Sequence, residues 1–127
     1  MLERDYIMRL IREFAEALEL LKKKDIRKQK DEIRRMYDQY VGPYTFYFTA
    51  TVSEVMQSME QFPAGQRLQR MEMLAELYYA EAGMHSQPFR TMLLEKALAL
   101  FSFIDRHDRT FSFDRLGKIS RIKAQLA

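Results

Sequence analysis

The 127-residue sequence contains no cysteine and no tryptophan, and it has only four glycines, three prolines and two histidines. The absence of cysteine excludes disulfide bonds, thiolate zinc sites, iron–sulfur clusters and a cysteine nucleophile. Few glycines and prolines leave little material for tight turns, which disfavours a β-sandwich with many strands. The length suits one domain, and we expect residues 1–127 to form a single all-α domain.

The sequence also lacks a long apolar run, since no stretch approaches the ~20 residues that cross a bilayer. Charged residues interrupt the N-terminal segment, and no cleavage site follows it, so it does not resemble a signal peptide. We therefore expect no association with a membrane and a cytoplasmic location.

Charge is unevenly distributed, although the net charge is only +3. Residues 22–35 contain eight basic and three acidic residues, and residues 106–123 contain six basic and two acidic residues. The sequence between them is net acidic. Basic segments of this kind bind nucleic acid, an anionic surface or an acidic partner, but solvated helix ends carry them as well.

Hydrophobic periodicity predicts helices along most of the chain. Apolar residues recur at the three-and-four spacing of one helix face over residues 2–23, 29–41, 65–83, 88–106 and 113–126. Thr51 and Glu54 have the spacing of a capping box, which predicts a shorter helix over residues 52–61. Gly83 marks a helix end, and Ser112 is the expected N-cap of the last helix.

The same periodicity divides these helices into buried and solvated faces. It places Phe89 on the buried face of the helix over residues 88–106. It places Glu72, Glu76 and Glu81 off the apolar stripe of the helix over residues 65–83. We expect Glu72 and Glu76 to be solvated rather than to act as an acid–base pair, because such a pair needs burial to separate its pKa values.

The most unusual segment is residues 44–52, in which aromatic and β-branched residues predominate. Propensity alone favours a strand there, but no second strand-like segment is present to pair with it. We therefore expect a short helical turn or an irregular aromatic plug. Its four rings cannot all point in one direction, so some of them are candidates for an exposed protein interface, with core filling as the alternative. These candidates are Tyr44, Phe46, Tyr47 and Phe48.

Residues 68–105 predict a helical hairpin with features of a tetratricopeptide repeat. Tyr79 and Gly83 have the spacing of the repeat's aromatic residue and turn glycine, and Leu94–Leu98 (LEKAL) resembles its second helix. The separation of Gly83 from Ala97 is longer than in the common form, and the ~34-residue period does not recur cleanly.

The whole chain resembles a family of small, functionally uncharacterised bacterial proteins with a tetratricopeptide-like all-helical fold. The segments Asp5–Phe14 (DYIMRLIREF), Leu94–Leu98 and Thr110–Arg115 (TFSFDR) carry this resemblance. It implies antiparallel helical hairpins in a right-handed array of about five to six helices, including a helical aromatic segment. It implies no known activity, cofactor or catalytic residue.

Patterns typical of catalysis and metal binding are scarce. His85 and His107 each fall where a helix is expected to end, so we expect surface or capping roles for both. Glu81 and His85 have i,i+4 spacing, but Gly83 lies between them and is expected to misalign their side chains. The acidic residues around His107 have arginine neighbours, which oppose a cation. The sequence also has no glycine-rich phosphate loop. We therefore expect no enzyme activity, no cofactor and no metal.

These observations favour a non-enzymatic helical scaffold that binds a protein or peptide partner, with self-association as a further possibility. The alternative is binding of nucleic acid or an anionic surface through the two basic segments. Because no helix-turn-helix, RNP or zinc motif is present, nucleic acid ranks behind a protein partner. The expected anion contacts on the last helix are Arg115, Lys118, Arg121 and Lys123.

Overall fold

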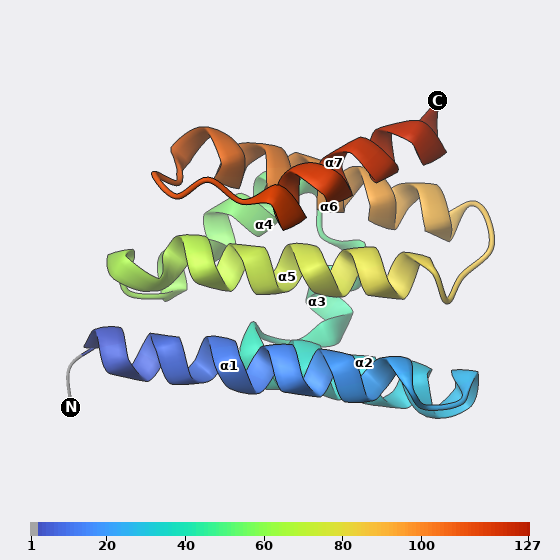
Figure 1. Ribbon diagram of the computed structural model, residues 1–127. Coiled ribbons are helices and arrows are strands. Elements are labelled where there is room, and N and C mark those ends of the chain that lie inside the picture. Colours follow the sequence, from blue (N-terminus) through green and yellow to red (C-terminus); the bar gives the residue numbers. More distant parts are fainter. Residues whose placement is uncertain (1–2) are drawn as a thin grey trace.

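A computed structural model of the chain describes residues 3–127, and all regular elements in this range are helical (Figure 1). The seven α-helices of this range are α1 (Glu3–Lys22), α2 (Ile26–Tyr40), α3 (Tyr44–Thr49), α4 (Val52–Ser58), α5 (Arg67–Ala82), α6 (Phe89–His107) and α7 (Phe113–Leu126). Two short 3-10 helices, η1 (Met59–Gln61) and η2 (Ala64–Gln66), lie between α4 and α5. The prediction of an all-α fold is confirmed. The helices number seven rather than five to six because the aromatic segment forms a helix of its own.

The helices lie in two layers (Figure 1). In the front layer α1, α5 and α7 run in the same direction, and α2 and α6 run back behind them. Short turns join α1 to α2 and α5 to α6, so each pair forms an antiparallel hairpin whose two helices pack against each other. The short helices α3 and α4 contact α2 and α6, respectively, in the back layer.

Most predicted helix boundaries agree with the observed ones, and α7 has the predicted bounds. The predicted start of α2 at residue 29 is wrong, because the helix begins at Ile26. Asp25 is its N-cap, and the Asp25 carboxylate accepts a hydrogen bond of 3.1 Å from the backbone N–H of Lys28. The predicted start of the first helix at residue 2 lies outside the described residues.

The predicted capping box at the start of α4 is confirmed. The Glu54 backbone N–H donates to Thr51 Oγ1 at 3.1 Å, and the Thr51 backbone N–H donates to Glu54 Oε1 at 2.8 Å. Together α4 and η1 cover the predicted helix over residues 52–61. Reciprocal capping fixes where the chain enters α4, immediately after the aromatic helix α3.

The chain turns tightly between α2 and α3. A Cβ atom built on Gly42 would lie 3.0 Å from the ring atom Cε2 of Tyr47, so only glycine leaves room for this ring. The Asp38 carboxylate accepts a hydrogen bond of 2.9 Å from the backbone N–H of Tyr44, the first residue of α3. These contacts attach the aromatic helix to the end of α2.

The core is one cluster of buried apolar side chains to which α1 to α7 all contribute. Its largest fully buried members include Tyr37, Tyr47, Tyr78 and Phe101.

Two assignments made from periodicity are wrong. Phe89 is 46% exposed, because it is the first residue of α6 and lies at the end of the hairpin, and Glu81 is only 2% exposed. Among the described residues, no helix is both long and apolar enough to span a membrane.

Candidate functional site

The aromatic helix α3 divides its rings between the core and the surface. Tyr47 is buried, and its hydroxyl lies 2.9 Å from Ser58 Oγ and accepts a hydrogen bond of 3.1 Å from Gln61 Nε2. Phe46 is 39% exposed, and Tyr44 and Phe48 are half-buried. The structure therefore places Tyr47 in the core and leaves three of the four predicted interface residues at the surface.

Buried polar side chains hold the C-terminal end of α3 in place. Lys96 Nζ donates to the backbone carbonyl of Phe48 at 2.8 Å and to that of Tyr47 at 3.3 Å. The Tyr78 hydroxyl donates to the same Tyr47 carbonyl at 2.6 Å. Burial lowers the pKa of Lys96. A cation at this position complements the negative end of the helix dipole, so Lys96 stabilises the conformation of the aromatic segment.

Beneath α3, the buried carboxylate of Glu81 contacts three polar side chains. Oε1 accepts a hydrogen bond of 2.8 Å from the Tyr37 hydroxyl, and Oε2 accepts one from the Tyr44 hydroxyl and lies 2.9 Å from His85 Nε2. The expectation that Gly83 misaligns Glu81 and His85 is therefore wrong, because the turn after α5 brings the imidazole back over the carboxylate. Burial raises the pKa of both Tyr37 and Tyr44, and the neighbouring Glu81 raises each further.

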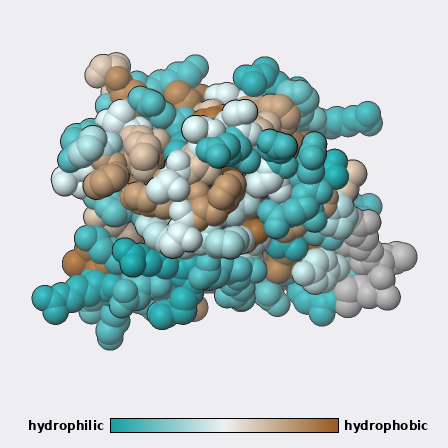
Figure 2. Space-filling view, turned by 180° about the vertical axis from the view of Figure 1, so that it is seen from behind, coloured by the Kyte–Doolittle hydropathy of each residue, from teal (hydrophilic) through white to brown (hydrophobic). Residues whose placement is uncertain are grey.

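Four rings form a continuous surface above this carboxylate, which we name the aromatic patch: Tyr44, Phe48, His85 and Phe89. The Phe48 ring centroid lies 5.6 Å from that of Tyr44, 5.8 Å from that of His85 and 5.5 Å from that of Phe89. Figure 2 shows that hydrophobic side chains gather on the back of the molecule, where α3 and the start of α6 lie. The structure thus extends the predicted interface with two residues from a distant part of the chain.

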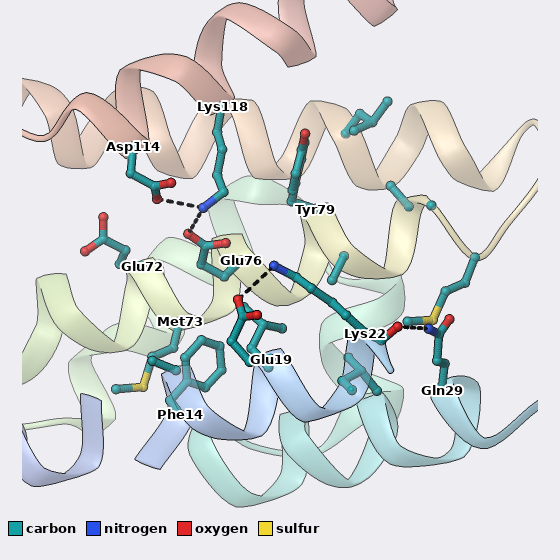
Figure 3. A pocket seen from close by; sticks show the side chains of 18 of the residues that line it. Phe14, Glu19, Lys22, Gln29, Glu72, Met73, Glu76, Tyr79, Asp114 and Lys118 are labelled. Carbon is teal, nitrogen blue, oxygen red and sulfur yellow. Dashed lines mark hydrogen bonds and ion pairs between the residues drawn. The ribbon is translucent and has the colours of Figure 1, made fainter. Parts of the chain in front are cut away.

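A large hollow lies on the opposite side of the molecule, between α1, α5 and α7 (Figure 3). We name it the front groove, and its volume is about 790 Å³. Its apolar lining includes Ile11, Phe14, Leu18, Met73 and Ala80. Its charged lining consists of Glu19, Lys22, Glu72, Glu76, Arg90, Asp114 and Lys118.

Ion pairs connect the walls of the front groove. Lys118 Nζ on α7 lies 2.7 Å from Glu76 Oε2 on α5 and 2.6 Å from Asp114 Oδ2 on its own helix (Figure 3). The expectation that Glu76 is solvated is wrong, because its side chain is only 15% exposed, and burial raises its pKa despite the Lys118 partner. On α1, Lys22 Nζ lies 3.2 Å from Glu19 Oε1.

The predicted anion contacts on α7 are used largely within the molecule. The Arg115 side chain is 3% exposed and lies within 3.4 Å of carboxylate oxygens of Glu72, Asp105 and Asp108. Lys118 is held by its two carboxylates. Arg121 Nε donates to the Tyr79 hydroxyl at 3.4 Å, and Lys123 is exposed. The structure therefore leaves Arg121 and Lys123 as the surface cations of this set.

The structure places His107 at the surface at the end of α6. Its ring stacks on Phe103 at a centroid distance of 4.0 Å, and its Nδ1 lies 2.8 Å from the Phe103 carbonyl oxygen. The two aspartates near it, Asp105 and Asp108, both pair with Arg115. Within residues 3–127, no group of three or more potential ligand side chains has the geometry to hold a metal ion.

Sequence reasoning missed the front groove and the buried position of Glu81. A weak signal for the groove exists on α5, where Glu72, Glu76 and Tyr79 follow the three-and-four spacing of one face. Opposite charges spaced along α7 could have suggested a partner helix for that face. For the Glu81 site, the i,i+4 spacing to His85 was the one local signal, because Tyr37 and Tyr44 lie 44 and 37 residues away in sequence.

Comparisons of the chain with protein-family models, with curated proteins and with solved structures gave no significant match. The resemblance to the bacterial helical family therefore stays a prediction.

Proposed function

We propose that the protein is a non-enzymatic interaction module whose front groove binds an amphipathic helix of a partner protein. The observation that carries this proposal is the groove itself, an open hollow of about 790 Å³ with an apolar lining and charged side chains along its walls. Ile11, Leu18 and Ala80 of this lining are partly exposed. Apolar side chains that remain accessible in a groove are typical of surfaces that accept the apolar face of a helix.

The dimensions of the front groove suit a helix. Its lining on α1 extends from Ile11 to Lys22, and a helix rises 1.5 Å per residue, so this wall is about 16 Å long. That length accommodates roughly three turns of a bound helix. Ala15, an exposed small residue in the middle of this wall, leaves space for a partner side chain.

The charges of the groove also support a partner helix of defined direction. Glu72 and Asp114 lie at one end, and Lys22 lies toward the other end (Figure 3). Each of them also has an ion-pair partner within the chain. Arg90 adds a second cation to the lining, and its Nε donates to the backbone carbonyl of His85 rather than to a carboxylate. A partner helix with basic residues at one end and acidic residues at the other complements this pattern.

We further propose that the two layers form a right-handed, tetratricopeptide-like array in the cytoplasm, as in the bacterial family that the sequence resembles. The hairpins α1–α2 and α5–α6 and the common direction of α1, α5 and α7 support this arrangement (Figure 1). In such arrays the first helices of successive hairpins line one concave surface, and the front groove lies on that layer.

Selection of helical peptides tests the groove. A displayed library of amphipathic helices is selected on the full chain, and the affinities of the binders are then measured for two variants. Ala15→Arg fills the groove from an exposed position. Ala124→Arg is the control, with the same substitution at an exposed position of α7 outside the groove. We expect Ala15→Arg to weaken binding at least about tenfold and Ala124→Arg to leave it unchanged. Equal binding to both variants, or no enriched helix, contradicts the proposal.

A second candidate function is supported by the turn between α1 and α2. The end of α1 and the start of α2 place the exposed side chains of Lys23, Lys24, Arg27 and Lys28 at one end of the molecule. This arrangement favours an anionic partner at the first basic segment, whereas in the second basic segment Arg115 and Lys118 are already paired with carboxylates. A gel-shift titration with single-stranded and duplex oligonucleotides at two salt concentrations tests it, since phosphate contacts give steep salt dependence.

A further inference from the structure

The aromatic patch combines exposed apolar rings with a line of cations. Phe89 is 46% exposed, and the rings of Tyr44 and Phe48 connect it to α2. There the Arg34 guanidinium lies 5.2 Å from the Tyr44 ring centroid. Arg27 and Lys30, exposed at seven and four residues before Arg34, lie on the same side of α2.

The carboxylates beside the patch are already engaged. Glu81 is buried and contacts Tyr37, Tyr44 and His85, and Asp38 accepts the backbone N–H of Tyr44. On the exposed face of α2, Asp31 lies among the three cations. Among the exposed charges of this face, the three cations outnumber the carboxylates of Asp31 and Asp38. The surface that borders the aromatic rings is therefore net positive and complements an acidic partner.

The ring geometry distinguishes between two kinds of anionic partner. Phe48 is inclined by 37° to Tyr44, by 53° to His85 and by 47° to Phe89. Tyr44, Phe48 and His85 are also only partly exposed, so the cluster does not present a row of free ring faces. Single-stranded nucleic acid needs such free faces for the stacking of successive bases. A single large apolar side chain can pack against such a cluster without a stacking requirement.

We infer that the aromatic patch and the cations of α2 form a second docking site, which binds an acidic peptide segment with a large apolar side chain. The apolar side chain packs on Phe48 and Phe89, and carboxylates beside it pair with Arg34 and Lys30. This site is distinct from the front groove and does not depend on the function proposed for it.

The test is a selection of unstructured peptides of roughly twelve residues, a length that spans the patch and α2 in extended form. The displayed library is selected on the full chain, and peptides that also bind the double variant Arg34→Glu/Phe89→Ser are removed. We expect the remaining sequences to combine several acidic residues with one or more large apolar residues. Enrichment of neutral or basic sequences, or no enrichment, overturns the inference.

Affinities of one selected peptide then test the individual contacts. We expect Arg34→Glu, on an exposed helix face, and Phe89→Ser each to weaken binding at least about tenfold. The matched controls are Arg109→Glu and Phe111→Ser, which change an exposed arginine and an exposed phenylalanine away from the patch, and they should bind like the unmodified chain. Ala15→Arg should also bind normally, which separates this site from the front groove.

Far-ultraviolet circular dichroism and thermal melting confirm that each variant is folded before its affinity is measured. An oligothymidylate probe provides the competing outcome. If it binds the unmodified chain, loses affinity in Arg34→Glu and displaces no acidic peptide, the surface recognises nucleic acid and the inference is wrong. An equal loss of peptide affinity in the Arg109→Glu control also contradicts the inference, because the loss then comes from the changed net charge of the chain.

Discussion

At the scale of single residues, the buried polar side chains determine how the helices meet. Glu81, Lys96 and Arg115 are each less than 8% exposed, and each contacts polar groups from another helix or loop. A buried charge without such partners would be strongly destabilising. These contacts connect elements that hydrophobic periodicity alone does not orient.

Replacement of Glu81 tests the importance of these contacts. We expect Glu81→Leu to lower the free energy of unfolding by about 2–4 kcal/mol, because the buried Tyr37 hydroxyl and the Tyr44 hydroxyl lose their acceptor. Tyr44→Phe removes one donor at a partly exposed position and should cost about 1 kcal/mol. Urea unfolding followed by circular dichroism measures both. A change of less than about 0.5 kcal/mol for Glu81→Leu would show that these hydrogen bonds contribute little.

The tyrosines also make stability depend on alkaline pH. The folded chain raises the pKa of Tyr37, Tyr44 and Tyr78 above the ordinary value of 10.0, mainly through burial. The folded state therefore retains protons that the unfolded state releases, and stability that is fully present below pH ~10 is lost as pH rises above it. For a fully buried tyrosine the slope is about 1.4 kcal/mol per pH unit.

We expect part of the tyrosinate absorbance to appear only when the helical signal is lost. Tyr37→Phe should reduce the number of protons released on unfolding above pH ~10 by about one. The unfolding free energy of this variant should therefore fall less steeply with pH. If all tyrosinate absorbance develops while the chain is still fully helical, burial does not protect these hydroxyls and the prediction is wrong.

At the scale of helices, local signals in the sequence are sufficient to predict most elements and their approximate bounds. The bounds of α7 follow from the spacing of Leu116, Ile119 and Ile122 and from the Ser112 cap, whose side chain accepts the Arg115 N–H at 3.1 Å. The periodicity predicts a start of α2 that is too far along the chain, because the first turn of this helix is highly polar. Only the Asp25 cap marks its start. Local patterns predict such elements because helix caps and apolar spacing act within a few residues.

The arrangement of the candidate sites could not be predicted in the same way. The aromatic patch brings Phe48 together with Phe89, and the front groove brings Glu76 together with Lys118. Each pair is separated by about forty residues and is joined only by the packing of whole helices. Phe89 was expected to be buried because periodicity identifies the apolar face of a helix but not where its neighbours end.

The capping box of α4 gives a prediction at the scale of one helix. Thr51→Ala removes the acceptor for the Glu54 N–H, and we expect it to lower the unfolding free energy by about 1 kcal/mol. Ser53→Ala, at an exposed position in the first turn, is the control and should have a much smaller effect. Chemical denaturation compares the two. Equal effects would mean that α4 is held by packing alone.

The attachment of α7 depends on Arg115. Its guanidinium contacts Asp105, Asp108 and Glu72, and its Nη2 donates to the Thr110 carbonyl at 3.0 Å. We expect Arg115→Lys to lower the unfolding free energy by about 2–4 kcal/mol, because a single ammonium group cannot reach all these partners. Arg109→Lys, an exposed substitution in the loop between α6 and α7, is the control for thermal melting. Similar melting temperatures for the two variants would contradict this role.

At the scale of the whole molecule, the two helical layers leave two different surfaces available. The front groove is bounded by α1, α5 and α7 and has an apolar lining with ion pairs along its walls (Figure 3). The aromatic patch belongs to α3, the turn after α5 and the first residue of α6. The ion pairs of Lys118 and the contacts of Glu81 hold the helices that shape these surfaces, so both are present before any partner binds.

The proposed function requires that the front groove binds a helix of a partner protein. The most direct measurement is the structure of the full chain in complex with a helical peptide selected on it. We expect the peptide to lie between α1, α5 and α7 as a helix, with its apolar side chains against the partly exposed Ile11 and Leu18 and with a side chain next to Ala15. A peptide seated elsewhere on the chain, with the front groove empty, would contradict the proposed function.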